Sequence, residues 1–252
     1  MTMRAILAGT IVFVAGGAVF AQTADTRPAF EAAFIKPNTT GSNGSRTNGS
    51  TGQIVMVNQT LKRLIERAYN VKQFQVTGPE WMENVRFDVT AKYPPDTKNE
   101  DRPAMLRTML EDRFKLATHR ETKEVPGYAL VVAKGGLKIK AVDADKGGGT
   151  DSNSSNSLVN LKMTAVSMKE LANYLAGRLG SAVIDGTGAD GVYTFELRWT
   201  LDDQLTGAVD RGAGEFAAIQ DAISALGLHL QAQKVPVEIV VVDHVERVPT
   251  EN

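Results

Sequence analysis

The chain has 252 residues, and its 28 basic and 29 acidic side chains give a formal net charge of −1 at pH 7. This balance, without a long run of one sign, argues against nucleic acid or an anionic membrane surface as the main partner. Cysteine is absent, which excludes disulfides, a lipid-anchored N-terminal cysteine, thiol catalysis and cysteine-ligated metal sites. The folded chain must therefore be stabilised by buried apolar surface.

Residues 1–21 have the pattern of a secretory signal peptide. Arg4 precedes an apolar stretch without charges that ends at Ala21, so we expect cleavage between Ala21 and Gln22. An uncleaved membrane anchor is the alternative, but the stretch is shorter than the ~20 residues that a helix needs to cross a bilayer. No later stretch is long and apolar enough for a membrane span. We expect the mature chain to be exported into the periplasm or the extracellular space.

Two segments rich in Gly, Ser, Asn and Thr interrupt the mature chain, at residues 38–52 and 147–157. Such residues bury too little apolar area to offset the entropy lost on ordering, so we interpret the segments as a flexible loop and a linker. The linker separates a first unit, residues 22–146, from a second unit, residues 158–252.

The first unit begins its regular pattern at Thr60, which occupies a helix N-cap position. Five apolar side chains follow with the spacing of one buried helical face: Leu61, Leu64, Ile65, Ala68 and Tyr69. A turn at Gly78 leads into an alternating strand over residues 87–93, and a second helix has Pro103 in its first turn. The unit is expected to close with two strands and a turn between them: residues 115–122, Pro126 and residues 128–133.

The second unit repeats this order. Ser167 and Glu170 form a capping box before a helix, a turn over residues 185–188 precedes a strand over residues 193–199, and Gly227 suits the end of a second helix. This unit too is expected to close with two strands around a turn: residues 229–234, Pro236 and residues 237–245.

The register between the two units is nearly kept. The offset from Thr60 to Ser167 is 107 residues, and that from Phe87 to Tyr193 is 106. The sequence therefore predicts an α+β fold of two tandem copies of a strand-helix-strand-helix-strand-strand unit, each a small sheet with two helices packed on it.

No catalytic or metal-binding constellation is readable. His119, His229 and His244 lie in predicted closing strands, without a histidine or carboxylate partner at metal-ligand spacing on a helix. A Gly-x-Ser-x-Gly nucleophile elbow is absent, and Asp185-Gly186-Thr187-Gly188 is interpreted as a tight turn. We predict no catalytic residues, no cofactor and no metal.

Trp81 is the residue kept as a candidate contact with a partner or ligand. It lies in the turn after Gly78-Pro79, where a core role is less automatic than in a strand. An exposed Trp can stack on a sugar ring or anchor a protein partner. Packing in the core is the alternative, and it is favoured.

Ten short motifs together resemble a family of secreted bacterial proteins, expanded in soil bacteria and classed as domain of unknown function 3738. The motifs are Phe30-Glu31, Ile35-Lys36-Pro37-Asn38, Leu61 to Tyr69, Gly78-Pro79-x-Trp81, Arg86-Phe87-Asp88-Val89-x-Ala91, Met109-Leu110-x-x-Arg113-Phe114-Lys115-Leu116, His119-Arg120-Glu121, Tyr128-Ala129-Leu130, Asp185-x-Thr187-Gly188-x-x-Gly191-x-Tyr193-x-Phe195 and Val242-Asp243-His244-Val245-Glu246. Gly186 is an addition to the family pattern.

The resemblance implies no established activity and no assigned catalytic residues. Relatives fused to membrane metallopeptidases of the antibiotic-sensor type imply sensing or interaction in the cell envelope. Each half is also similar to the short N-terminal domains of secretins and TonB-dependent receptors, which bind protein partners.

We therefore expect a non-enzymatic protein-interaction or sensing module of the cell envelope, with an envelope protein as partner. The alternative is a periplasmic or extracellular protein that binds a glycan or small molecule in a cleft between the units, with Trp81 as a contact. A third hypothesis is an uncharacterised hydrolase that uses His119 or His244.

Overall fold

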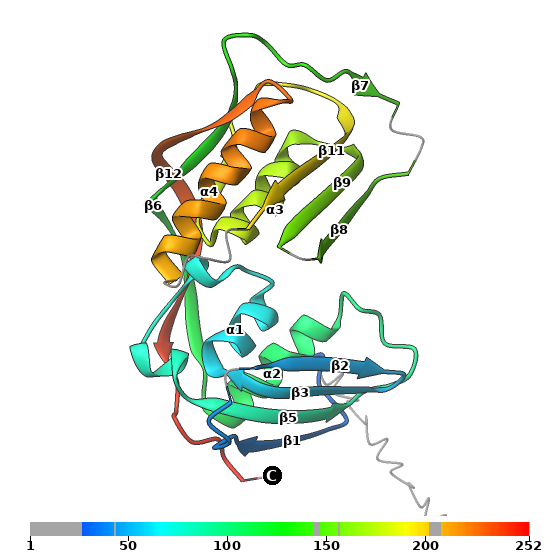
Figure 1. The fold of residues 1–252 in the computed structure, drawn as a ribbon. Helices are drawn as coiled ribbons and strands as arrows, with labels where there is room; N and C mark the ends of the chain where they lie inside the picture. Colours follow the sequence, from blue (N-terminus) through cyan, green and yellow to red (C-terminus); the bar gives the residue numbers. More distant parts are fainter. Residues whose placement is uncertain (1–26, 43, 144–146, 156, 202–207, 252) are drawn as a thin grey trace, which may run out of the picture.

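The computed structural model of the chain describes residues 27–42, 44–143, 147–155, 157–201 and 208–251, with side chains from residue 214 onward in the last range. The expected signal peptide and its cleavage site at Ala21 and Gln22 lie outside these residues. Figure 1 shows two lobes, joined along one side by two long strands. These are β6 (Ala117–Val132) and β12 (Leu228–His244).

Lobe 1 is built on a four-stranded antiparallel sheet in the order β1-β5-β3-β2. Its strands are β1 (Ala32–Pro37), β2 (Arg46–Ser50), β3 (Gln53–Thr60) and β5 (Arg86–Lys92). Two helices, α1 (Leu61–Tyr69) and α2 (Arg102–Phe114), pack on one face of the sheet. Short 3-10 turns, η1 (Gln73–Gln75) and η2 (Glu80–Glu83), follow α1.

Lobe 2 repeats this arrangement with the sheet order β7-β11-β9-β8, again antiparallel. Its strands are β7 (Ala141–Val142), β8 (Gly149–Ser155), β9 (Leu158–Val166) and β11 (Val192–Thr200). The helices α3 (Met168–Leu179) and α4 (Ala208–Ser224) cover its inner face.

The third sheet belongs to both lobes and has the order β10-β6-β12-β4, with β4 (Val76–Thr77) and β10 (Ala182–Asp185) as short parallel edges. The strands β6 and β12 pair antiparallel from Ala117 opposite His244 to Val132 opposite Leu228. Each strand ends in the other lobe, because Leu130 of β6 lies in the lobe 2 core and Val242 of β12 lies in the lobe 1 core. The two units of the sequence are therefore intertwined in space.

The predicted turns at Pro126 and Pro236 are wrong, because both prolines lie inside the continuous strands β6 and β12. At this crossing the ribbon of β6 and β12 has only two strands, since β10 begins to pair at Gly127 and β4 pairs near Val240. A proline has no N–H to donate, so a strand tolerates it where no further strand pairs on its outer side.

The segments expected to lack structure contain strands instead: β2 within residues 38–52, and β8 within residues 147–157. The interpretation as a flexible loop and a linker rested on composition alone, whereas an edge strand can be held by main-chain hydrogen bonds without burying its side chains. In lobe 1, the buried Asn58 amide adds bonds to the carbonyl oxygens of Ser42 (2.6 Å) and Gly44 (2.7 Å).

The predicted α+β class is confirmed, and the helix starts are as expected. Thr60 caps α1 by accepting from Arg63 N, and Ser167 with Glu170 forms the capping box of α3. The order β2-β3-α1-β4-β5-α2-β6 in the first unit recurs as β8-β9-α3-β10-β11-α4-β12 in the second. Duplication of one ancestral unit, with the division at residues 147–157, stays a prediction.

Candidate functional site

A cavity of about 250 Å³ lies in lobe 1, between strand β3 and the facing ends of α1 and α2. It is lined by Phe30, Ile54, Met56, Arg67, Asn70, Asn99, Arg102, Pro103 and Leu106. An apolar cavity with a few polar groups at one place has the composition typical of small-molecule sites.

The apolar part of the cavity follows from the periods of strand and helix. Ile54 and Met56 are two residues apart on β3, so both side chains point to the face covered by the helices. Leu106 is contributed by the second turn of α2 and is buried. Phe30 lies before β1, and its ring centroid is 6.3 Å from that of Tyr93.

Two arginines supply the charge of the cavity. Arg67 lies in the last turn of α1, and Arg102 is the first residue of α2. Neither guanidinium forms an ion pair with any described carboxylate. The Nε atom of Arg102 is buried and has no hydrogen-bond partner among the described residues. The cavity therefore presents the Arg102 guanidinium without an ion-pair partner among the described residues, whereas the charge of Arg67 acts on the neighbouring Glu66 carboxyl.

Tyr93 holds the Arg102 guanidinium, which lies 4.7 Å from the centroid of the tyrosine ring. The Tyr93 hydroxyl donates to the carbonyl oxygens of Ser50 (3.1 Å) and Gln53 (3.2 Å), so the ring cannot turn away freely. A cation over an aromatic face is attracted by the negative charge of that face. Arg102 is thus positioned without being neutralised.

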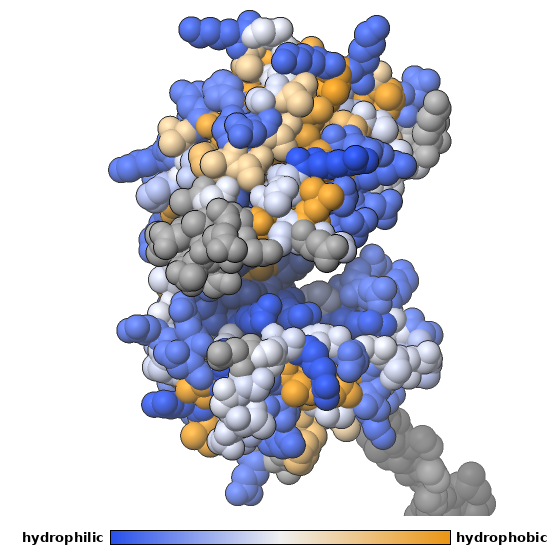
Figure 2. Space-filling view, in the orientation of Figure 1, coloured by the Kyte–Doolittle hydropathy of each residue, from blue (hydrophilic) through white to orange (hydrophobic). Residues whose placement is uncertain are grey.

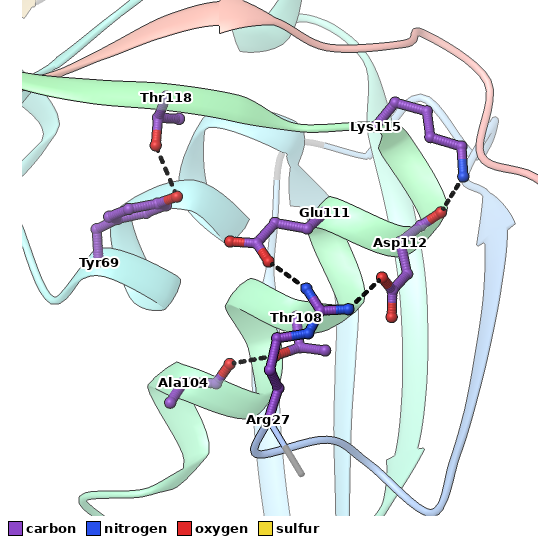
Figure 3. A network of polar contacts seen from close by, with 8 residues as sticks. All are labelled: Arg27, Tyr69, Ala104, Thr108, Glu111, Asp112, Lys115 and Thr118. Carbon is purple, nitrogen blue, oxygen red and sulfur yellow. Dashed lines mark hydrogen bonds and ion pairs between the residues drawn. The ribbon is translucent and has the colours of Figure 1, made fainter. Parts of the chain in front are cut away.

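The helices that carry these arginines are tied to their surroundings. The guanidinium of Arg107 in α2 lies 4.6 Å from the ring centroid of Tyr69 in α1 and donates to the Ala68 carbonyl oxygen (3.3 Å). Figure 3 shows the Tyr69 hydroxyl bonded to Thr118 of β6 at 2.8 Å. These contacts fix the separation between the two helix ends at the cavity.

Arg27, the first described residue, adds a further tie to α2. As Figure 3 shows, its guanidinium reaches both Glu111 (3.1 Å) and Asp112 (3.2 Å). Arg27 and Asp112 are largely exposed and Glu111 is 34% exposed, so the pairs stabilise the fold little. They nevertheless hold the segment before Phe30, which lines the cavity, against lobe 1.

A second depression, of about 200 Å³, lies where the lobes meet. Lys72 and Gln75 of the first unit, Asn173 of α3 and Glu238 of β12 are among its lining residues. In Figure 2, hydrophilic surface of lobe 1 borders the hollow between the lobes. The Gln75 amide donates to the Glu238 carbonyl oxygen at 3.0 Å, which bridges the first unit and β12. The ligand-binding cleft expected between the units stays a prediction.

Trp81 lies in η2, half-buried against the lobe 1 core. The guanidinium of Arg247 lies 5.9 Å from the centroid of its ring. Trp81 lines neither the lobe 1 cavity nor the groove between the lobes. Its role as a contact for a partner or ligand stays a prediction.

The structure brings together a histidine and a carboxylate that the sequence patterns did not connect. His119 Nδ1 lies 2.8 Å from Asp243 Oδ1 across the ribbon of β6 and β12, although 124 residues separate them. The pair is about half exposed, and no described hydroxyl group is bonded to His119. A nucleophile for a Ser-His-Asp mechanism is thus not in place among the described residues.

His229 lies in β12 opposite Val131, and His244 ends the same strand opposite Ala117. Within the described residues, no group of three or more His, Asp or Glu side chains is placed to hold a metal ion. Burial raises the pKa of the Glu66 carboxyl on α1, although the neighbouring Lys62, Arg63 and Arg67 oppose the shift. Glu66 does not line the lobe 1 cavity.

Residues 62–245 match a protein family described as a protein of unknown function (DUF3738). The match spans both lobes and includes Arg67 and Arg102 of the cavity. No curated protein and no solved structure was found to match the chain. In the part of the chain that the structure describes, no helix is long and apolar enough to cross a membrane.

Proposed function

The chain belongs to the DUF3738 family of proteins of unknown function, and on this premise we propose that it is an exported, non-enzymatic binding protein of the cell envelope. Its ligand site is the lobe 1 cavity. The observation that carries the proposal is an apolar cavity bordered by two arginines, Arg67 and Arg102, neither of which forms an ion pair with a described carboxylate. A guanidinium in such a place gains most from an anionic group that replaces its lost water.

Binding is favoured over catalysis by the position of the titratable groups. His119 and Asp243 lie on the exposed ribbon of β6 and β12, and neither residue lines the cavity. The cavity itself contains arginines and amides, which orient a ligand but do not exchange protons near neutral pH. A site of this composition can hold a ligand without transforming it.

Export is supported by the charge and apolar pattern of residues 1–21. The test is the intact mass of the protein after expression in a bacterium with its full N-terminus. Loss of the residues up to Ala21 is the expected result. Retention of those residues in a membrane fraction would show an anchor instead.

The cavity is tested with N-phenyl-1-naphthylamine, a neutral dye whose fluorescence increases in apolar surroundings. We expect saturable binding to the mature chain, residues 22–252, and loss of that binding in Ile54→Phe, which fills the cavity. Val55→Phe is the matched control, because the neighbouring side chain points to the opposite face of β3. Equal binding by Ile54→Phe and wild type, with both folded by circular dichroism, would refute the site.

A second candidate function, binding of a protein partner by strand addition, is favoured by β8. All seven residues of β8 are exposed, and the strand ends its sheet, with β9 as its neighbour on one side. An open strand edge can accept a further strand through main-chain hydrogen bonds. Asn153 and its neighbours carry no large apolar side chain, so such binding would depend on the main chain.

This candidate is tested with a photo-crosslinking residue at position 153 in the exported protein. An envelope protein captured from this position, but not from position 196 on the outer face of β11, would support strand addition. Capture from both positions, or from neither, would contradict it.

A further inference from the structure

We infer that the lobe 1 cavity recognises a carboxylate attached to a short apolar body and a neighbouring amide. The source of this chemistry is either a free N-acylated amino acid or the C-terminal residue of a peptide. The inference rests on the proposed function and adds the class of ligand to it. Three features of the cavity carry it: the fork of Arg102, the volume of the cavity, and its pair of asparagines.

The arginines favour a planar anion. A guanidinium offers parallel N–H groups that match the two oxygens of a carboxylate. Arg102 is already held over the Tyr93 ring at 4.7 Å, so little side-chain freedom is lost when it binds. Arg67 approaches from the end of α1, a different element, so the two cations border the cavity from two directions.

The floor of the cavity favours an apolar body over a bare anion. Ile54, Met56 and Leu106 also line the cavity, and none of their side chains can hydrogen-bond a phosphate oxygen. The volume of about 250 Å³ is below the usual range for drug-sized ligands, which begins at about 300 Å³. One apolar side chain with its carboxylate is therefore a suitable occupant, and a long chain is not.

The asparagines favour an amide beside the carboxylate. Asn70 lies at the end of α1 and Asn99 before α2, and both residues line the cavity. A carboxamide provides both a donor and an acceptor, which matches the N–H and C=O of an amide group. This combination of carboxylate, apolar side chain and amide is the chemistry of an acylated amino acid or of a peptide C-terminus.

The inference is tested by displacement of N-phenyl-1-naphthylamine from the mature chain. N-acetyl-leucine is the probe, N-acetyl-leucinamide is its neutral counterpart, and inorganic phosphate is the bare anion. We expect N-acetyl-leucine to compete at least tenfold better than either of the other two. Equal competition by acid and amide, or competition by phosphate as strong as that by the acid, would overturn the inference.

Variants connect the effect to the two arginines. We expect Arg67→Gln and Arg102→Gln each to weaken competition by N-acetyl-leucine about tenfold, while the neutral dye still binds. Arg198→Gln, a substitution of an exposed arginine in lobe 2, is the control and should change neither. Unchanged competition in both cavity variants would overturn the inference. Because dye binding is measured in the same experiment, failure of the carboxylate class can be told apart from failure of the cavity as a site.

A peptide arm identifies the source of the carboxylate. A hexapeptide that ends in leucine is compared with the same peptide amidated at its C-terminus. Tighter competition by the free peptide than by N-acetyl-leucine supports a peptide C-terminus, and weaker competition supports a free acid. Competition by the amidated peptide equal to that by the free peptide would count against carboxylate recognition.

Discussion

The two lobes use an arginine in the same way but leave it in different electrostatic states. In lobe 2, the guanidinium of Arg178 lies 5.7 Å from the ring centroid of Trp199 and forms an ion pair with Glu215 of α4. In lobe 1, Arg102 lies over Tyr93, but no described carboxylate pairs with it. Lobe 2 therefore pairs its cation with a carboxylate, whereas Arg102 of lobe 1 forms no ion pair with a described carboxylate.

Arg67, the second arginine of the cavity, also has a different counterpart in lobe 2. Arg67 of α1 corresponds to Tyr174 of α3 at the offset of 107 residues that relates Thr60 to Ser167. Tyr174 packs against the lobe 2 core, and its hydroxyl lies 2.8 Å from that of Ser152 in β8. The position that borders an open cavity in lobe 1 is used for packing in lobe 2.

Each lobe has a β-bulge before its first helix, and the two bulges also differ in the charge of the side chain that holds them. Asn58 and Ala165, again 107 residues apart, both have a positive φ, at 56° and 48°. The backbone N–H of Asn58 donates to Asp88 Oδ1 (2.9 Å), and the backbone N–H of Ala165 donates to Thr194 Oγ1 (3.0 Å). The same β-bulge is thus held by a carboxylate in lobe 1 and by a neutral hydroxyl in lobe 2.

Asp88 also reaches beyond the bulge. Its Oδ1 accepts from the Asn38 amide at 2.7 Å, and its Oδ2 lies 3.6 Å from Lys36 Nζ. Burial by itself raises the pKa of the Asp88 carboxyl, but the two hydrogen bonds and the lysine outweigh it, so the pKa lies below its ordinary value. The ionised carboxylate thereby holds the bulge and the start of the 38–52 segment together.

The largest effect on the free energy of unfolding is expected from substituting Asp88 and Thr194, one at a time. Asp88→Ala should lower the free energy of unfolding by about 2 kcal/mol, because hydrogen bonds to a charged group are lost, and Thr194→Val by about 1 kcal/mol. Urea denaturation measures both. Glu196→Ala, on the exposed face of β11, is the control and should have little effect. A Thr194→Val variant less stable than Asp88→Ala would reverse the contrast between the bulges.

The Asp88→Ala and Thr194→Val variants are also expected to differ in how their stability depends on pH. Because the folded-state pKa of Asp88 is depressed, its stabilisation is present above the ordinary value of 3.8 and is lost as the pH falls through the lower folded-state pKa. The stability difference between wild type and Asp88→Ala should therefore shrink between about pH 5 and about pH 2. The difference between wild type and Thr194→Val should stay constant over that range, as urea titrations at each pH would reveal.

Lobe 1 can be made to resemble lobe 2 by adding the missing acid. Asn99→Asp places a carboxylate in the cavity beside Arg102. It should weaken competition by N-acetyl-leucine about tenfold, equivalent to about 1.4 kcal/mol. Asn173→Asp, in the groove between the lobes, is the control. If Asn99→Asp binds the acid as tightly as wild type, the absence of a counter-charge does not govern binding.

The smallest effect concerns the helix caps. Glu170 Oε2 accepts from Ser167 N (2.7 Å) and from Ser167 Oγ (2.8 Å), whereas α1 has Arg63 at the corresponding position. Glu170→Ala should lower the free energy of unfolding by about 0.5 kcal/mol, and Arg63→Ala should leave the Thr60 cap intact. Differential scanning calorimetry of the two variants would measure this, and a larger loss in Arg63→Ala would contradict it.

Some features could be predicted because they depend on residues close together in the chain. The caps at Thr60 and Ser167 involve a residue and its third neighbour, and the alternation of Phe87 and Val89 reports a strand with one buried face. The α+β class follows from the order of such segments, as does the family to which the chain belongs.

The site could not be predicted in the same way. Arg67 and Arg102 lie in different helices, and nothing in either helix pattern indicates that their ends border one cavity. His119 and Asp243 meet only because two long strands pair over their whole length. A candidate such as Trp81 could be selected by residue type, but its half-buried position beside Arg247 depends on where the C-terminal segment runs.

The sequence by itself determined the local elements, the balance of charge and the absence of cysteine. Only the tertiary structure decided that β6 and β12 cross between the lobes, that Asn58 orders a polar loop, and that Arg67 and Arg102 border one cavity. The physical reason is that a pattern of side chains reports which face of an element is buried. It does not report which distant element covers that face, or which charge is left without a partner.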